Sequence, residues 1–427
     1  MKKIYDNITK CRVCGSEQLT EVVKIEKQYL SPTFVETNEN NPLASYQVPQ
    51  TLILCDKNKN PTGCGLLQLK ETVQPDYLYK NYFYRSAIND TMRRDLNDVV
   101  VDSLSRIEIE KEDIVVDIGA NDCTMIDYFP SELTRIGVEP AENICWDHVD
   151  SSIHIVNDYF SKDSLVPLVG NKKIKIFTSC AMFYDLDDPN SFVADIKTML
   201  HPNGIWCVQL SYLPLMLENI NFYDICNEHL EYYSLHTLSI LMQRHDLKIV
   251  DASKNEVNGG SIRVFVAHES GSSVESPTLL SLYEAEIALN LFDANTFFKF
   301  HERIIALREK VGRCVMGEIE KGKLVIGLGA SSKGNMLLQF FGITKNELPY
   351  ISERNPEKVG LRTLGTDIEL ISEEKGRSLR PSCMLVLPWY FKNEIVARER
   401  DYIASGGMLL FPMPYPHLVH SDGETKL

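Results

Sequence analysis

Four cysteines near the N-terminus have the types and spacing of metal ligands. They form two pairs, and a glycine directly follows the second cysteine of each pair: Cys11, Cys14, Cys55 and Cys64. Four thiolates suit tetrahedral Zn²⁺, and glycine permits the tight turn that each pair needs. The surrounding residues offer no His/Glu pair and no open coordination position, so we predict a structural zinc site. Four unrelated buried thiols are the alternative interpretation.

A second group of residues surrounds a glycine turn. From Asp113 the sequence predicts a buried strand, a turn at Gly119 and an apolar-periodic helix, which is the first unit of a doubly wound fold. The turn, Asp117-x-Gly119-x-x-x-Cys123, departs from the dinucleotide fingerprint because it begins with an acid and ends with cysteine in place of glycine. The acid discourages a pyrophosphate and suits the positively charged amino-acid end of S-adenosylmethionine.

A carboxylate at the end of the next strand completes this pattern. Glu139 follows Asp117 by twenty-two residues, the position from which a carboxylate accepts hydrogen bonds from ribose hydroxyls. We expect S-adenosylmethionine to be bound by Asp117, Gly119, Asn121 and Glu139. An uncommitted Rossmann-like unit is the alternative.

Glu228 and His229 are adjacent in a long polar connection that follows a predicted strand. Ligands in open α/β sheets bind beyond the carboxyl ends of the strands, so this connection is expected to lie over the cofactor crevice. A histidine has a pKa near neutrality and can act as a base, while the neighbouring carboxyl group orients the substrate or donates a proton. A histidine that caps the following helix is the alternative.

A second glycine turn occurs in the C-terminal part. It reads Gly327-x-Gly329 and continues to Lys333-Gly334 at the start of a predicted helix. Backbone amides at a helix N-terminus, together with a lysine, form an anion site that suits a diphosphate. A structural copy whose glycines only form a tight turn is the alternative. The candidate substrate ligands are Lys333, Asn335 and, further away, Arg263.

Composition excludes several classes of protein. The 427 residues carry a formal net charge of −15, which repels nucleic-acid phosphates and anionic lipids. The N-terminus lacks the apolar core of a signal peptide, and no apolar run approaches the ~18 residues of a membrane span. Eleven cysteines, an odd number in a long chain, favour thiols and metal ligands over disulfides. We therefore expect a cytoplasmic protein without nucleic-acid or membrane partners.

Several motifs together resemble one family. The paired Cys-Gly turns, E-H-L-x-Y-Y-S at 228–234, NGGSIRV at 258–264 and GLGASSKGNMLLQFFGI at 327–343 resemble the sugar C-methyltransferases that methylate carbon 3 of nucleotide-linked 4-keto-6-deoxysugars. The resemblance covers nearly the whole chain. It implies three units of an α/β protein: a small zinc-binding domain, a class I S-adenosylmethionine-dependent methyltransferase domain and a second Rossmann-like domain.

These units are expected at residues 1–75, 76–256 and 257–427, with a helical linker in the last between about 275 and 322. The resemblance places the nucleotide sugar between the last two domains. It implies His229 as the base, beside Glu228, and a tyrosine of the segment 82–86, for which we favour Tyr84. His229 would remove the proton next to the ketone while Tyr84 or protonated Glu228 stabilises the oxyanion.

Two departures from the family leave alternatives open. Many members carry tyrosine and histidine where this chain has Cys226 and Asn227. The same architecture could therefore methylate a different carbon acid, one that is not a sugar or is activated differently. A non-catalytic, zinc-stabilised binding module is a further alternative. The sequence leaves the nucleotide base, the stereochemistry and the oligomeric state open.

Overall fold

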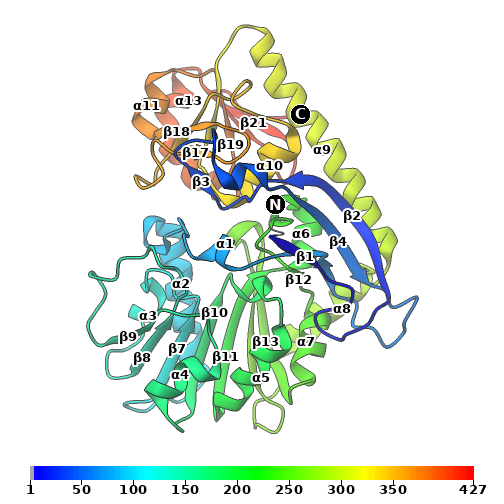
Figure 1. Ribbon diagram of the computed structural model, residues 1–427, viewed down its shortest axis with the longest axis vertical. Coiled ribbons are helices and arrows are strands. Elements are labelled where there is room, and N and C mark those ends of the chain that lie inside the picture. Colours follow the sequence, from blue (N-terminus) through cyan, green and yellow to red (C-terminus); the bar gives the residue numbers. More distant parts are fainter. Residues whose placement is uncertain (1–3) are drawn as a thin grey trace.

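Three large β-sheets organise the chain in the computed structural model, which describes residues 4–427 (Figure 1). The central sheet has seven strands, the N-terminal sheet has four and the C-terminal sheet has nine. In Figure 1 the central sheet occupies the lower part and the C-terminal sheet the upper part, with the N-terminal sheet beside the junction. The α/β class expected from the sequence is confirmed.

The central sheet has the strand order β13-β14-β11-β10-β7-β8-β9, and β14 is antiparallel to both of its neighbours. Its strand β7 is buried at every position, as in sheets covered by helices on both faces. The elements of this part are α2 Asp90–Leu104, β7 Ile114–Ile118, α3 Thr124–Asp127, β8 Thr134–Val138, β9 Ile153–Val156, α4 Lys162–Val169, β10 Ile174–Cys180, α5 Pro189–Met199, β11 Leu200–Ser211, α6 Leu213–Asn219, α7 Leu235–Gln243, β13 Leu247–Asn255 and β14 Ser261–His268.

The central sheet includes a strand that lies beyond the expected domain boundary. The sequence interpretation ended the central domain at residue 256, but β14 at Ser261–His268 pairs with β11 and β13 inside the central sheet. The apolar residues of β14 are buried against these neighbours, which explains why the strand belongs here. The strand β14 therefore belongs to the central sheet, while the domain boundary at residue 256 stays a prediction.

The N-terminal sheet contains a strand from a distant part of the sequence. Its order is β12-β5-β4-β2, and β12, Glu231–Tyr232, comes from the connection that carries Glu228 and His229. The other elements of this part are β1 Tyr5–Asn7, β2 Leu19–Gln28, β3 Phe34–Val35, β4 Val48–Cys55, β5 Leu67–Leu69, β6 Glu71–Val73 and α1 Asp76–Tyr79. We call residues 226–234 the Glu-His segment.

The C-terminal sheet has a parallel core, β20-β19-β15-β16-β18, as expected for a Rossmann-like unit. The N-terminal strand β3 completes one edge by pairing with β17. The elements are β15 Val325–Leu328, α10 Ser332–Phe341, β16 Tyr350–Glu353, β17 Arg362–Thr363, β18 Glu369–Ser372, α11 Glu373–Ser378, β19 Cys383–Val386, α12 Lys392–Arg398, α13 Arg400–Ala404, β20 Met408–Phe411, β21 His417–His420 and β22 Gly423–Lys426.

Two helices connect the central and C-terminal parts: α8 Pro277–Ala288 and α9 Ala294–Glu320. The second has 27 residues, and Figure 1 shows it running along the side of the molecule from the lower to the upper part. Its buried residues recur every three or four positions, from Phe297 to Val315, which is the stripe of an amphipathic helix. This stripe shares one hydrophobic core with β2, β4, the Glu-His segment and α10, so the three units are packed together.

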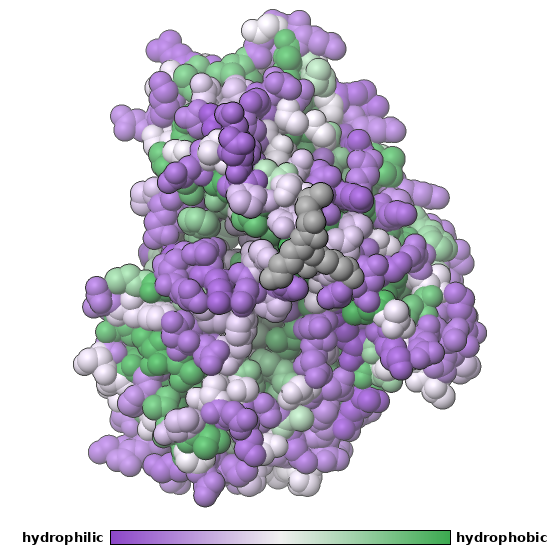
Figure 2. All heavy atoms as spheres, in the orientation of Figure 1, coloured by the Kyte–Doolittle hydropathy of each residue, from purple (hydrophilic) through white to green (hydrophobic). Residues whose placement is uncertain are grey.

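The surface is largely hydrophilic on the face seen in Figure 2, with smaller hydrophobic patches between the hydrophilic residues. None of the helices within residues 4–427 is both long and apolar enough to cross a bilayer.

Arg263 lies inside the central sheet, which corrects its assignment as a phosphate ligand. Its guanidinium contacts the carboxylates of Asp95 at 3.1 Å and Asp102 at 2.5 Å, and its Nε donates to Gln209 at 2.9 Å. The side chain is buried in β14, where these partners neutralise its charge. The sequence could not indicate this pairing because Asp95 and Asp102 lie on α2, far away along the chain.

Replacement of Arg263 by methionine is expected to lower the free energy of unfolding by about 3–5 kcal/mol, because the buried Asp95 carboxylate loses its partner. Urea denaturation measures this change. The control is Arg354→Met, since Arg354 pairs with Glu394 at the surface and its loss should cost about 0–1 kcal/mol. A loss of stability no larger than that of the control would contradict this interpretation.

Candidate functional site

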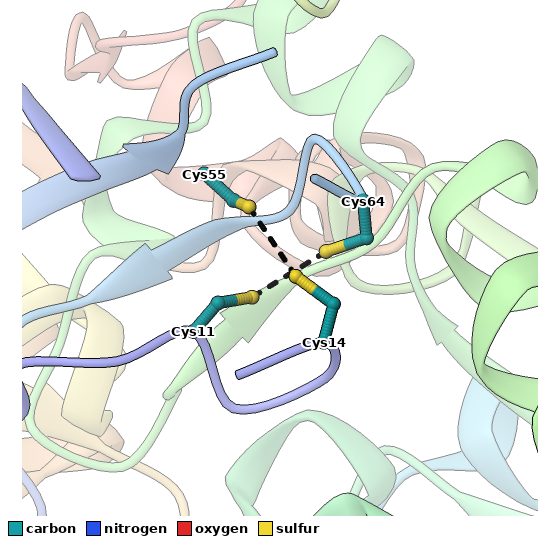
Figure 3. A group of neighbouring side chains, drawn as sticks. All are labelled: Cys11, Cys14, Cys55 and Cys64. Atoms are coloured by element: carbon teal, nitrogen blue, oxygen red, sulfur yellow. Dashed lines mark hydrogen bonds between the residues drawn. The ribbon is translucent and has the colours of Figure 1, made fainter. Parts of the chain in front are cut away.

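The four N-terminal cysteines converge on one point, as Figure 3 shows. Their sulfur atoms all lie within 4.8 Å of one another, with 3.4 Å between Cys11 and Cys64 and 3.5 Å between Cys14 and Cys55. Tetrahedral Zn–S bonds of about 2.3 Å place sulfurs about 3.8 Å apart, so this thiol set fits a zinc ion. The glycines after Cys14 and Cys64 have φ of +75° and +80°, which confirms the predicted tight turns.

The first glycine turn lies at the carboxyl end of β7. Gly119 has φ of +76°, and its amide donates to the carbonyl of Val138 at 2.9 Å. Asn121 also has positive φ, and its amide donates to Glu139 Oε2 at 2.9 Å. Glu139 Oε1 accepts a second bond, from the amide of Ala141 at 2.9 Å. The turn and the end of β8 are thus joined by one buried carboxylate.

This arrangement fits the ribose of S-adenosylmethionine. Each oxygen of Glu139 takes one backbone amide, and a carboxylate has lone pairs left to accept further donors such as ribose hydroxyls. Burial raises the pKa of Glu139. The side chain of Asn121 is occupied by the segment above the turn, because it accepts from the amide of Ser86 and donates to the carbonyl of Tyr84.

Asp117 lies below the turn in β7 and is completely buried. Its Oδ1 accepts a hydrogen bond from Thr178 Oγ1 at 2.9 Å. Burial raises the pKa of Asp117 to about 7, and the neighbouring carboxylates of Glu139 and Asp122 add to the shift. A cation placed here would favour the ionised carboxylate, which is the electrostatic match expected for the α-ammonium group of S-adenosylmethionine.

The C-terminal sheet repeats the geometry of the first glycine turn. Gly329 has φ of +80°, and its amide donates to the carbonyl of Ser352 at 2.8 Å. Glu353 at the end of β16 accepts from the amides of Ala330 and Asn355, each at 2.7 Å. The acid that precedes the first turn has no counterpart here, because Gly327 occupies the matching position. The two turns therefore share a backbone design but differ in charge.

Glu228 lies between the central and C-terminal parts. Its carboxyl oxygens lie 3.5 Å from Ser332 Oγ, at the start of α10, and 3.9 Å from Cys226 Sγ. Burial raises the pKa of Glu228 to about 7, while Ser332, Tyr82 and Lys333 act in the opposite direction. Near neutral pH a large fraction of this carboxyl group carries a proton and can donate a hydrogen bond.

His229 is buried beside the ring of Tyr184, with 4.3 Å between the ring centroids. Burial lowers the pKa of His229 well below 6.5, and nearby Lys333 adds to this effect. The imidazole also interacts with the backbone carbonyl of Asp224. At neutral pH the ring is uncharged and has a nitrogen that can accept a proton. The expected pair of Glu228 and His229 is therefore present in complementary protonation states.

The tyrosine that faces Glu228 is Tyr82, whose phenol interacts with the Glu228 carboxyl group. Tyr84, favoured from the sequence, is 42% exposed and has Ser86 and Tyr390 as neighbours of its phenol. Both residues belong to the same short segment, and the bend of the backbone decides which phenol faces the carboxyl group. The role of Tyr84 in stabilising the oxyanion stays a prediction, and Tyr82 is the tyrosine of this segment whose phenol contacts Glu228.

Two candidate substrate ligands have protein partners instead. Lys333 Nζ lies 2.6 Å from the carboxylate of Asp224 in a nearly buried ion pair. The amide of Asn335 donates to the carbonyl of Ser31 at 2.8 Å, while the amide nitrogen of Ser31 donates to Asn227 at 3.2 Å. Asn335 therefore joins three parts of the chain, and Lys333 has its charge neutralised. The sequence showed the positive charge of Lys333 but not the carboxylate that meets it.

The central sheet has seven strands in the order β13-β14-β11-β10-β7-β8-β9. A glycine turn follows its first strand in sequence, and a carboxylate follows its second. These features define a class I methyltransferase domain that binds S-adenosylmethionine. Comparison with known families agrees over most of the chain. A zinc binding domain matches residues 11–79, a methyltransferase domain matches 91–252 and a C-methyltransferase C-terminal domain matches 256–414. These three matches together account for most of residues 11–414, and the four N-terminal thiols have the arrangement of a zinc site.

One relative can be aligned with this chain over nearly the full length of both. The C-methyltransferase NovU of Streptomyces niveus is 26% identical over 426 residues, which is 99% of each chain. Similar solved structures include an S-adenosylmethionine-dependent methyltransferase from Clostridium acetobutylicum, with 11% identity, a TM-score of 0.32 and coverage of 43% of this chain and 92% of that one. Another is the YcgJ protein of a Bacillus, with 12% identity, a TM-score of 0.33 and coverage of 42% and 99%.

Binding of S-adenosylmethionine at about pH 6.5 is expected to release a proton, because the cofactor's ammonium group favours ionised Asp117, whose pKa in the free chain is about 7. Calorimetry in two buffers of different ionisation enthalpy measures the release. Asp117→Asn should abolish it and weaken binding about 10- to 100-fold. Asp163→Asn, at an exposed position of α4, is the matched control. Undiminished proton release from Asp117→Asn would exclude Asp117 as the source.

Proposed function

We propose that this chain methylates carbon 3 of an NDP-4-keto-6-deoxysugar, with His229 as the base. The observation that carries the proposal is the pair formed by uncharged His229 and a partly protonated Glu228, buried where the central and C-terminal parts meet. A ketone makes the neighbouring C–H acidic only if the developing oxyanion is stabilised. A neutral base beside a proton donor is the combination that this reaction needs.

His229 acts as the proton acceptor. Its interaction with the Asp224 carbonyl engages one ring nitrogen, which leaves the other to take the proton from the substrate carbon. A pKa well below 6.5 means that the ring is already unprotonated at neutral pH. The buried imidazolium produced by the reaction is disfavoured, so it readily returns the proton to solvent or product.

Glu228 and Tyr82 stabilise the oxygen of the substrate. A protonated Glu228 donates to the keto oxygen as negative charge develops there, and the Tyr82 phenol on the same side supports the carboxyl group. Ser332 brings α10 against Glu228, so the C-terminal part completes the site. The cofactor supplies an activated methyl group on its sulfonium. Glu139 and Asp117 orient it, so that proton removal and methyl acceptance occur in one closed space.

Replacement of His229 by alanine is expected to leave S-adenosylmethionine affinity unchanged and to lower kcat by about 10²- to 10⁴-fold, the usual contribution of a general base. Solvent deuterium exchange at the sugar carbon should fall in parallel. The assay offers dTDP-4-keto-6-deoxyglucose as one test substrate, and the products are read by mass spectrometry and NMR. His154→Ala, at an exposed position of β9, serves as the control.

The position of the new methyl group tests the regiochemistry, since a ketone at carbon 4 acidifies both carbon 3 and carbon 5. A methyl group on carbon 5 would contradict our assignment of carbon 3 while preserving the mechanism. Retained exchange in the His229 variant would show that another group is the base. Turnover of a different carbon acid, with none of any nucleotide sugar, would overturn the substrate assignment.

The rate of methyl transfer is expected to fall as pH rises through about 7, because Glu228 then loses the proton that it donates. About one tenth of the carboxyl groups stay protonated one pH unit above the pKa. His229 is unprotonated throughout this range and does not contribute to the fall. Glu228→Gln keeps a donor and should flatten the profile of kcat between about pH 6 and 9. An unchanged alkaline fall in this variant would assign the titration to another group.

A further inference from the structure

Arg12 lies between the zinc ligands Cys11 and Cys14, yet its side chain is only 2% exposed. Its guanidinium donates to the carbonyl of Leu69 and to Thr72 Oγ1, each at 2.6 Å, and its Nε lies 3.3 Å from Asp187. Its backbone takes part as well, because the amide donates to Gln68 and the carbonyl accepts from Asn190. One residue of the zinc site therefore contacts both the N-terminal sheet and the central part.

The same guanidinium faces the Glu-His segment. Arg12 Nε lies 3.6 Å from Glu231 Oε1, and the side chain of Glu231 is fully buried. The amide of Leu186 also faces this carboxyl group. Within residues 4–427, neither oxygen of Glu231 makes a hydrogen bond of good geometry. Arg12 is therefore the cationic group that lies against the buried side chain of Glu231.

Glu231 is close to the base in space as well as in sequence. It follows His229 by two residues in β12, where it pairs with Gln68 of β5. Glu231 and His229 also line one small cavity of about 10 Å³, together with Asp224 and Ser211. A displacement of Glu231 would therefore move the backbone that carries the imidazole.

We propose that Arg12 is a positioning residue that transmits the geometry of the zinc site to His229 through Glu231. The metal holds the loop of Cys11 and Cys14, the loop holds the guanidinium, and the guanidinium holds the buried carboxylate of β12. The inference rests on the proposed role of His229 as the base. It implies that the zinc site, although it holds no substrate, sets the rate of the chemical step and leaves cofactor binding unaffected.

The test uses the full-length, zinc-loaded chain and the variants Arg12→Met, Arg12→Lys and Glu231→Gln. Arg12→Met is expected to lower kcat about 10- to 100-fold, the effect of a small displacement of a reacting group. Zinc content, measured by atomic emission, and the Kd of S-adenosylmethionine should stay unchanged. Arg12→Lys should restore part of kcat. Backbone amide exchange of residues 225–232, followed by mass spectrometry, should become faster in Arg12→Met.

Lys10→Met is the matched control, because Lys10 precedes the same zinc ligand but pairs with Glu17 at the surface. It should match the unmodified chain in every measurement. If Arg12→Met alone does not fold, the double variant Arg12→Met/Glu231→Gln tests the proposal, since it removes the uncompensated carboxylate. We expect the double variant to fold, with a slow kcat and fast exchange at residues 225–232.

Two results would overturn the proposal. The first is normal kcat and normal exchange at residues 225–232 in Arg12→Met. The second is a parallel loss of zinc, cofactor affinity and kcat, which would show a general structural role. Because amide exchange needs no substrate, it decides the role of Arg12 even if no nucleotide sugar is methylated. A failure of the proposed function can therefore be distinguished from a failure of this inference.

Discussion

The position of the Glu-His segment depends on the pairing of β12 with the N-terminal sheet. β12 adds to β5, and β5 lies beside β4, whose last residue is the zinc ligand Cys55. Cys64 stands at the entry to β5, so the metal holds the ends of the two strands that carry β12. A small sheet has a thin core and gains its rigidity from the metal. The segment that carries Glu228 and His229 is thus held by a neighbouring domain.

The second constraint on this site is that its acidic groups are buried without enough partners of opposite charge. The chain carries a net charge of −15, and several of its carboxyl groups lie where water does not reach. Burial raises the pKa of Asp117 and of Glu228 to about 7, so that both groups respond to a nearby charge or oxyanion near neutral pH. The same burial keeps His229 uncharged. The lysine closest to this site, Lys333, already has Asp224 as its partner.

Much of the molecule follows from local patterns in the sequence. The zinc ligands, the two glycine turns and the strands that precede them were predicted because each depends on residues close together along the chain. Glu139 was found because strand and helix lengths in a doubly wound unit set its distance from Asp117. Local patterns were insufficient where one element joins a distant sheet. The pairing of β14 with the central sheet and of β12 with the N-terminal sheet was not predicted, because strand pairing is decided by neighbours far away in sequence.

The sequence by itself determined the order of the three units, the metal ligands and the residue types available for chemistry. Only the tertiary structure decided which of these residues are free to act. Arg263, Lys333 and Asn335 looked like ligands for an anion, but each has a partner from another element. The phenol of Tyr82, and not that of Tyr84, contacts the Glu228 carboxyl group. A charge or a hydroxyl is visible in a sequence, whereas its partner, its burial and hence its pKa arise only when distant segments pack together.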